Sequence, residues 1–422
     1  MAQTPALPPV ESPTGDDAVI TVYRAGERTL PQRGGGGTID RVSQLAELLR
    51  ELVKDRSRID EPAFRKAMAV RAPASVKALA TDLDDYAAFC RGGCLPGLPA
   101  SEVQVVHYIE DCEARGLKPA TVARRLASLA AIHSILGCSS PTKRDSVRDA
   151  LLELRGRSAA QRTADPIRLG NDGLATAPAK GITLNALLEA CDLTPPGLRD
   201  AALLSLGYDT GLRVSELVAV GFADIELQDD GSAHLPVRCS MTDQAGRGTR
   251  AWVSPEAVRR LTDWVEESGI HDGAMFRRVA VRRFKARSGM QARPIRELAW
   301  NYRGGDERLS ASAGRPARVD YAIGEHALTP AAVRLIIKRA ARRAADMGLV
   351  PLTGQALDAA IATLSTHSLR VGLTQDLFAA GEDAGSIAQA LRWSSPTTAA
   401  RYGRDLAPAS HATARQLCSR RS

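Results

Sequence analysis

The chain has 422 residues, enough for two or three domains that each bury a hydrophobic core without disulfides or metals. Hydrophobic residues make up 44% and charged residues 25% of the sequence, which excludes a chain that is disordered throughout. The formal net charge is +8, and only eight of the 56 basic residues are lysines. Because arginine can bind phosphate through two parallel hydrogen bonds, this excess favours a polyanionic partner, although a high-GC coding bias would also raise arginine.

The cysteines and the hydropathy of the chain indicate its compartment. Seven cysteines are scattered without a C-x-x-C pair, which is typical of a reducing environment. Cys90 and Cys94 are one helical turn apart, but no second His or Cys pair follows at zinc-finger spacing, so we expect no metal site. No apolar run reaches the roughly 18 residues of a membrane helix, and the N-terminus does not resemble a signal peptide. We therefore expect a cytoplasmic protein that does not bind a membrane.

The N-terminal part of the chain changes from a predicted tail to a predicted helical bundle. Residues 1–37 are rich in proline, glycine and threonine and contain little apolar material, so we expect a disordered tail. Residues 38–72 have apolar residues at three- and four-residue spacing, which predicts a helical N-terminal extension. Residues 73–162 consist of consecutive helical patterns, two of them with the cap residues Ser75 and Ser101, and predict an all-helical domain.

One helix of this domain carries a pair of arginines. Its apolar stripe consists of Val122, Leu126, Leu129, Ile132 and Ile135. Arg124 and Arg125 lie off the stripe, so we expect them to face solvent or a ligand. Taken alone, such a pair is more often a solvated helix face. Residues 163–180 have no periodicity and several prolines and glycines, which is typical of an interdomain linker.

Residues 181–422 predict a second, mainly helical domain that contains a small antiparallel sheet. Helical patterns flank Asp209-Thr210-Gly211. The period then changes, and turn signals at Asp230-Gly231 and between Ala245 and Gly248 separate short strands. Helices resume at Pro255.

A basic insertion interrupts this domain at about 277–326. Between Arg277 and Arg318 there are eleven arginines and Lys285 against three acidic residues, a local net charge of +9. Because glycine, serine, alanine and proline dominate its middle, we expect a partly ordered segment that projects from the domain. It is either a solvated loop or a contact with nucleic-acid phosphate.

Arg213 follows a glycine turn at the predicted start of a helix. An arginine at this position points out of the turn, and Glu216, one helical turn later, can fix its guanidinium. The alternative is an ordinary surface ion pair between the two residues.

Two further motifs lie near the C-terminus. His367 and Arg370 are three residues apart on a predicted helix that Gly381 can end, so they share one face. Such a pair arises by chance about once in a chain this rich in arginine. Further on, Ser395-Pro396 begins a short helix that presents Tyr402.

Together these motifs resemble the tyrosine recombinase (phage integrase) family over residues 73–422. The family's first arginine motif resembles Thr210 to Leu217, its His-x-x-Arg motif resembles His367 to Arg370, and its nucleophile resembles Tyr402. Its His/Trp position resembles Trp393. The resemblance implies a mainly α fold: an all-helical core-binding domain at 73–162 that contacts DNA, and a mainly α catalytic domain with a small antiparallel sheet at 181–422.

These residue types suit the cleavage of a phosphodiester. Attack on phosphorus builds negative charge on the non-bridging oxygens, which Arg213 and Arg370 can bind while staying protonated. Tyr402 would form a covalent 3′-phosphotyrosyl link with a DNA 5′-hydroxyl as the leaving group. His367 would shuttle a proton or bind the phosphate, and Trp393 would pack against the site or simply fill the core. Neither a cofactor nor a metal is needed.

The sequence departs from the family at one position. The family places a lysine in the β-hairpin turn, where it protonates the leaving oxygen, and the matching residue here is Met241. Arginine is a poor proton donor, so the neighbouring Arg247 cannot replace that lysine. Either another residue is the acid, or the protein cleaves slowly, or the change stalls it.

We therefore expect a site-specific DNA recombinase or integrase of a mobile element or phage, acting in the bacterial cytoplasm on the nucleoid. A cleavage-impaired DNA-binding accessory protein and a type IB topoisomerase-like enzyme are the alternatives. The expected partner is double-stranded DNA with a specific site, and the resemblance implies a homodimer and then a homotetramer on DNA, coupled through the C-terminal tail. The expected DNA contacts are Lys77, Lys118, Thr121, Arg124, Arg125, Arg247, Arg282, Arg283 and Lys285.

Overall fold

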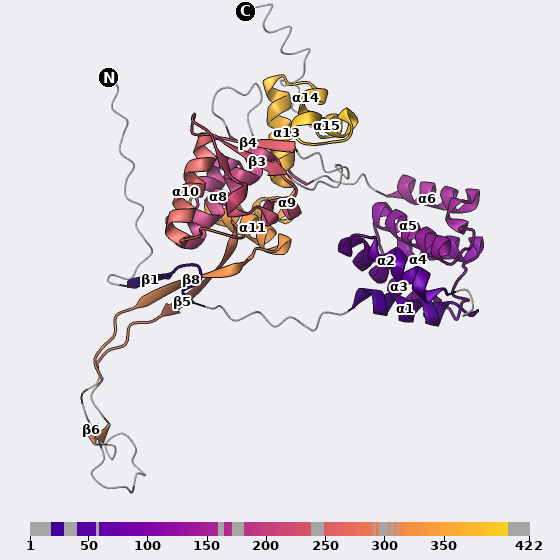
Figure 1. Cartoon of the computed structure of the whole chain (residues 1–422), viewed down its shortest axis with the longest axis horizontal. Helices are drawn as coiled ribbons and strands as arrows, with labels where there is room; N and C mark the ends of the chain where they lie inside the picture. The colour runs from indigo at the N-terminus through magenta and orange to yellow at the C-terminus, as the bar shows by residue number, and fades with distance from the viewer. Residues whose placement is uncertain are drawn as a thin grey trace, which may run out of the picture. The chain divides into compact units, whose positions relative to one another are not determined.

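The protein forms two compact units. The computed structural model describes residues 18–28, 40–55, 59–158, 164–170, 181–237, 249–289 and 312–403, together with 291, 293–294, 303 and 308–309. One unit, the helical unit, spans residues 32–162, and the other, the mixed unit, combines residues 1–31 with 163–422 (Figure 1). No helix in the described part of the chain is both long and apolar enough to cross a membrane.

In the part of the helical unit that the structure describes, there are six α-helices and a short 3-10 helix. They are α1 Arg41–Leu52, α2 Glu61–Ala69, α3 Pro73–Gly92, α4 Glu102–Ala114, α5 Pro119–Ile135, η2 Pro141–Lys143 and α6 Asp145–Arg157. Leu49 of α1 and Phe64 of α2 lie in one hydrophobic core with Tyr86 and Tyr108. Helices α1 and α2, which lie in the predicted extension at 38–72, are therefore part of this bundle and not separate from it, because their apolar faces are buried against the later helices.

Local signals fix most of these helix boundaries. The hydroxyl of Ser101 accepts a hydrogen bond from the backbone of Gln104 and caps α4, as the sequence predicts. Ser75 does not act as a cap, because α3 begins two residues earlier at Pro73. Proline is favoured in the first helical turn, where its missing N–H removes no hydrogen bond.

The mixed unit is built around α8, which packs against α10, α13 and β4. Its helices are α7 Leu184–Glu189, α8 Pro195–Thr210, α9 Val214–Ala219, η3 Phe222–Asp224, α10 Pro255–Ser268, α11 Pro330–Asp346, α12 Gly354–Thr363, α13 Ser368–Ala380, α14 Ala384–Ala390 and α15 Pro396–Gly403. Strands β2 Glu226–Leu227, β3 Ala233–Val237 and β4 Thr249–Val253 form an antiparallel sheet in that order. The predicted mainly α fold with a small antiparallel sheet is confirmed.

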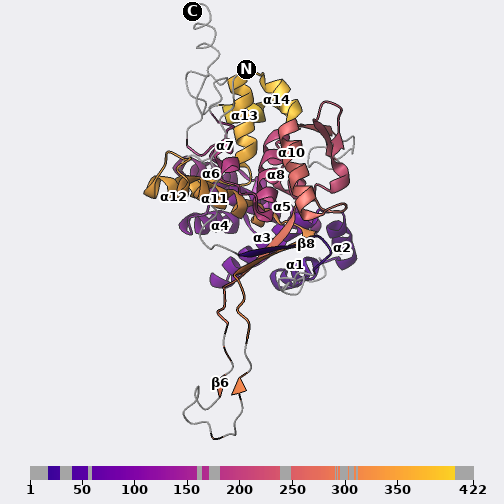
Figure 2. The ribbon, with the colours of Figure 1, turned by 90° about the vertical axis from the view of Figure 1, so that its left-hand side faces the viewer.

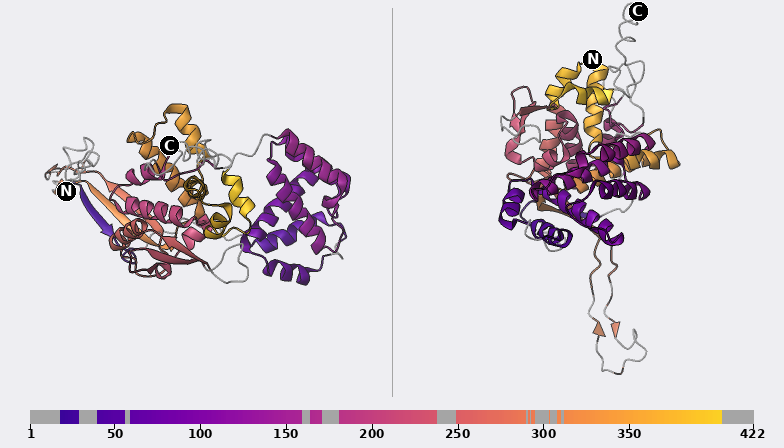
Figure 3. Two further views of the ribbon diagram at one scale, coloured as in Figure 1. Left: turned by 90° about the horizontal axis from the view of Figure 1, so that it is seen from above. Right: turned by 90° about the vertical axis from the view of Figure 1, so that its right-hand side faces the viewer.

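A second sheet recruits a strand from the N-terminus. Strand β8, Arg318–Ala327, pairs antiparallel with β5, Arg277–Phe284, and parallel with β1, Val19–Tyr23 (Figure 3, left). The prediction of a disordered tail through residue 37 is therefore wrong for residues 18–28. The β-branched run of β1 finds hydrogen-bond partners on the edge of β8, a contact that no local pattern reveals. The rest of the predicted tail lies outside the described residues.

The described residues of the basic insertion form a long two-stranded ribbon (Figure 2). Outside β5 and β8, a bridge joins Arg287 to Arg315, and β6 Arg293–Pro294 pairs with β7 Arg308–Leu309. From Val279 to Pro294 the described pairs keep the register of β5 and β8, because Arg287 and Arg315 are each three residues beyond the paired Phe284 and Arg318.

Part of the predicted linker is bound to the mixed unit. The backbone N–H of Ile167 donates to the carbonyl of Ser368 over 3.0 Å, and the Asp376 carboxylate accepts from Arg168 and from the backbone of Leu169. Close approach requires glycine in α13, since a Cβ at Gly372 would lie 1.7 Å from the Ile167 carbonyl oxygen. Residues 164–170 are therefore not a free linker, and residues 171–180 lie outside the described part.

Candidate active site

Arg213 is positioned by a tight turn between α8 and α9. Gly211 ends α8 with a left-handed φ of 53°, and a Cβ there would lie 2.5 Å from the Leu391 side chain. Arg213 is the N-cap of α9, and Glu216 accepts from both its backbone N–H (2.8 Å) and its guanidinium Nη1 (2.9 Å). Glu216 thus fixes Arg213 as predicted, and the pair is mostly buried, with side-chain exposures of 26% and 9%.

Arg370 projects from the first turn of α13 into the interior. Only 1% of it is exposed, and its two terminal nitrogens donate to the carbonyls of Gly211 and Leu391. Burial, helped by the positive charges of Arg213 and Arg392, lowers the pKa of Arg370 to about 10. The guanidinium therefore remains protonated at neutral pH, and it has N–H donors beyond those two bonds.

Tyr402 and His367 meet beside this arginine. The hydroxyl of Tyr402 lies 2.8 Å from Nε2 of His367. The Tyr402 ring stacks on Trp393, with centroids 5.4 Å apart and planes 15° apart, and the guanidinium carbon of Arg370 lies 4.9 Å from the centre of the Trp393 ring. The structure thus brings together these four predicted residues. Arg213 is close by in the chain, two residues after Gly211, whose carbonyl accepts from Arg370.

The protonation state of His367 follows from its surroundings. Burial lowers the pKa of His367 from its usual 6.5, and the charges of Arg370 and Arg213 lower it further. At neutral pH the imidazole is therefore neutral, and a neutral ring nitrogen can accept the phenolic proton of Tyr402.

Sequence reasoning missed a third arginine at this site. Arg392 has a left-handed φ of 56° and 7% exposure, and its Nη2 donates to the carbonyl of Thr210 over 3.1 Å. Arg392 follows the C-terminus of α14, at the position where helices usually have glycine. The backbone N–H of Arg392 donates to the carbonyl of Gln389, and the backbone N–H of Trp393 donates to the carbonyl of Ala388. These are the two hydrogen bonds of a Schellman motif. This turn sets the position of Trp393. The only signal for this residue in the sequence is that no glycine follows the helix that ends at Ala390, so that another residue type must take the left-handed position.

The expected DNA contacts of the helical unit are only partly at its surface. Lys77, Lys118 and Arg124 are exposed, and Thr121 is half-buried. Arg125 was expected to face solvent or a ligand, but only 11% of its side chain is exposed and its Nη1 lies 2.6 Å from Asp85. That expectation is wrong because Asp85, on the neighbouring helix α3, draws the guanidinium inward.

The remaining predicted residues are divided between the ribbon and an undescribed segment. Arg282, Arg283 and Lys285 are exposed on the ribbon. Met241 and Arg247 lie outside the described residues.

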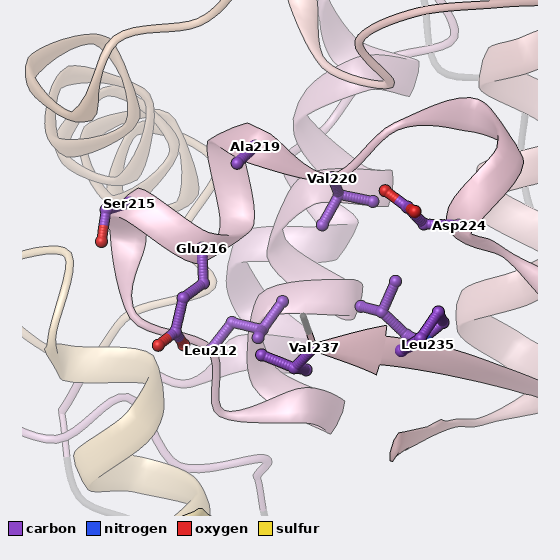
Figure 4. Close-up of a pocket in the computed structure, with 9 residues that line it drawn as sticks. Leu212, Ser215, Glu216, Ala219, Val220, Asp224, Leu235 and Val237 are labelled. Carbon is purple, nitrogen blue, oxygen red and sulfur yellow. The ribbon is translucent and has the colours of Figure 1, made fainter. Parts of the chain in front are cut away.

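A depression borders the site on the side of α9 and β3 (Figure 4). The described residues that line it are Leu212, Ser215, Glu216, Ala219, Val220, Asp224, Leu235, Pro236 and Val237. Because this lining includes two carboxylates and no basic side chain, the depression is not suited to a phosphate.

Comparison with known proteins identifies the relatives of this chain. No family model matches it. An integrase/recombinase XerD homolog of Selenomonas ruminantium is 30% identical over 236 residues, which cover 53% of this chain and 65% of the relative. The Cre recombinase of Escherichia phage P1 is 22% identical over 224 residues, 53% of this chain and 60% of the relative. Both relatives are recombinases, and this chain is similar to each of them over about half of its own length.

The chain spans a little under two thirds of the length of these curated relatives. Among solved structures, a XerH site-specific recombinase bound to its palindromic difH substrate has a TM-score of 0.48 and 14% identity, with 90% of this chain and 92% of that chain covered.

Proposed function

We propose that this protein is a tyrosine recombinase that cleaves and rejoins duplex DNA through Tyr402. The observation that carries the proposal is the 2.8 Å contact between the Tyr402 hydroxyl and His367, beside the buried guanidinium of Arg370. A nucleophile, a neutral base and fixed positive charge are the three components that attack on a phosphodiester requires.

In the proposed reaction, the Tyr402 oxygen forms a bond to phosphorus while its proton passes to His367. The bond from phosphorus to the 5′-oxygen breaks, and that oxygen leaves as a hydroxyl after taking up a proton. Arg213 and Arg370 bind the two non-bridging oxygens, whose charge grows in the transition state. A second 5′-hydroxyl attacking the phosphotyrosine reverses the step and joins new strands.

The leaving 5′-oxygen also needs a proton donor. The attacking and leaving oxygens lie in line on opposite sides of phosphorus, so His367, which contacts Tyr402, is on the attacking side. The family's lysine is replaced by Met241, which carries no proton to donate. We therefore propose that cleavage of ordinary DNA is slow and limited by protonation of the leaving oxygen.

We further propose a role in site-specific recombination for a mobile element or phage, with a monomer that assembles on DNA into dimers and then a tetramer. The C-terminal tail, residues 404–422, lies outside the described part of the chain. Deletion after Asp405 should leave half-site binding intact and remove cooperativity. Unchanged cooperativity would show that the tail does not link the protomers.

The decisive experiment is adduct formation with Tyr402→Phe. Wild-type protein incubated with nicked duplex from the DNA flanking its gene should leave a covalent adduct on a denaturing gel, and the variant should leave none while binding within a few-fold. If the wild-type protein forms no adduct, even on a substrate whose 5′-bridging oxygen is replaced by sulfur and whose leaving group needs no proton, a non-cleaving DNA-binding protein would be favoured. Relaxation of supercoiled DNA lacking any target site would favour a topoisomerase.

A further inference from the structure

The two faces of the β5–β8 ribbon carry very different charge. Because side chains alternate along a strand, Arg283, Lys285 and Arg287 share one face with Arg315, which is paired with Arg287 on the opposite strand. All four side chains are exposed, and none is paired with a carboxylate among the residues that the structure describes. We call these four residues the cationic face.

The opposite face has fewer cations without an acidic partner. It carries Arg282, Phe284, Arg318 and Asp320. Arg318 stacks over Phe284 at 4.5 Å and bonds the buried carboxylate of Asp320 at 2.9 Å, while Arg28 reaches the same carboxylate at 3.6 Å. Arg318 and Arg28 therefore have an acidic partner within the protein, whereas the exposed Arg282 has none among the residues that the structure describes.

The cationic face is unfavourable for the isolated ribbon. Arg287 and Arg315 exchange two backbone hydrogen bonds of 2.8 Å, so their side chains stand directly opposite each other. Like charges in this position repel, and Lys285, two residues along the same strand at a spacing of about 6.6 Å, adds to the repulsion. A polyanion on this face would convert the repulsion into attraction.

We propose that the cationic face binds duplex DNA beyond the phosphate that Tyr402 attacks. The proposal rests on the proposed function, because it assumes that the mixed unit acts on DNA. Arg287 is eight residue steps along the strand from Val279, which packs half-buried against the core at the base of the ribbon. At about 3.3 Å per residue in an extended strand, Arg287 therefore lies about 26 Å from that base. A two-stranded ribbon also fits the major groove of B-form DNA, where both strands' phosphates are within reach.

The first test measures the salt dependence of binding. The full-length triple variant Arg283→Thr, Lys285→Thr, Arg287→Thr keeps strand-favouring residues while losing three charges. On a non-specific duplex of about 40 base pairs, each lost phosphate contact should reduce the slope of log affinity against log salt by about 0.9, or about 2.7 for the triple variant. An unchanged slope would overturn the proposal.

Two neighbouring single variants provide a matched control. Arg283→Thr and Arg282→Thr remove the same charge from adjacent positions on opposite faces. The first should reduce the slope by about 0.9 and the second should leave it unchanged. Equal effects would contradict a face-specific contact. Covalent adduct formation on nicked duplex, measured in parallel, distinguishes failure of this proposal from failure of the proposed cleavage activity. If the variants form adducts and their salt slopes equal that of the wild type, only the contact between the ribbon and DNA is refuted.

Cross-linking provides a second readout that does not depend on charge removal. Lys285→Cys and Ala286→Cys, each carrying a photoreactive group, direct that group to opposite faces. The first should cross-link to the duplex and the second should not, with labelled wild-type protein accounting for the native cysteines. Cross-links from Lys285→Cys to a second protein copy in place of DNA would overturn the proposal.

Discussion

Arg392 allows backbone strain and site charge to be separated experimentally. A side chain with a Cβ costs about 1–2 kcal/mol in the left-handed conformation that Arg392 adopts at a φ of 56°. Arg392→Ala removes the guanidinium and keeps that cost, whereas Arg392→Gly removes both. After the extra chain entropy that glycine loses on folding, about 0.5–1 kcal/mol, the glycine variant should be the more stable by about 0.5–1 kcal/mol.

Urea unfolding of the two variants, followed by tryptophan fluorescence, measures this difference directly. Both variants lose the same hydrogen bond to Thr210, so that loss cancels between them. An alanine variant as stable as the glycine variant would refute the strained Schellman turn at Arg392.

The same pair of variants tests the charge of the site. Removing Arg392 takes a positive charge from beside Arg370 and should raise the pKa of Arg370 toward its usual range. With less positive charge near Tyr402, adduct formation should fall by at least about tenfold, and equally in both variants, because they differ only in the backbone. Unaltered adduct formation would show that the Arg392 charge plays no part in cleavage.

Three further predictions concern acid, base and packing. Met241→Lys should speed cleavage of ordinary DNA by about 10²–10⁴-fold and leave the 5′-bridging sulfur substrate unchanged; no gain on ordinary DNA would mean that another residue is already the acid. Because only neutral His367 can accept a proton, adduct formation should rise with pH and reach half its maximum below pH 6.5, and a midpoint above 6.5 would contradict the lowered pKa. Gly372→Ala should lower the free energy of unfolding by at least about 2 kcal/mol, since its Cβ would displace the buried Ile167. Gly156→Ala, which meets open space in α6, is the control for that variant.

Local signals in the sequence were sufficient for much of the site. The Arg213–Glu216 pair and the His367–Arg370 pair each lie three residues apart, so helical geometry alone places their members together. Pro396 likewise fixes the start of the helix that presents Tyr402.

Features set by distant contacts could not be predicted in this way. Arg125 lies off the apolar stripe of its own helix, and its burial depends on Asp85 of another helix. The inward turn of Arg392 depends on the carbonyl of Thr210, far away in the sequence. Neither contact can be predicted from a single sequence, because the spacing of apolar residues along a helix shows which side of that helix is buried but not which distant residues it contacts.

The pairing of β1 with β8 has a consequence for dividing this protein into fragments. The mixed unit is discontinuous in sequence, because β1 precedes the whole helical unit while β8 follows it. A fragment that begins at residue 163 would leave the β1 side of β8 as an open row of backbone donors and acceptors. Such an edge templates strand addition from a second molecule. Self-association of that fragment would then report the missing strand and not the natural assembly, so a separated mixed unit should carry residues 18–28 fused ahead of it.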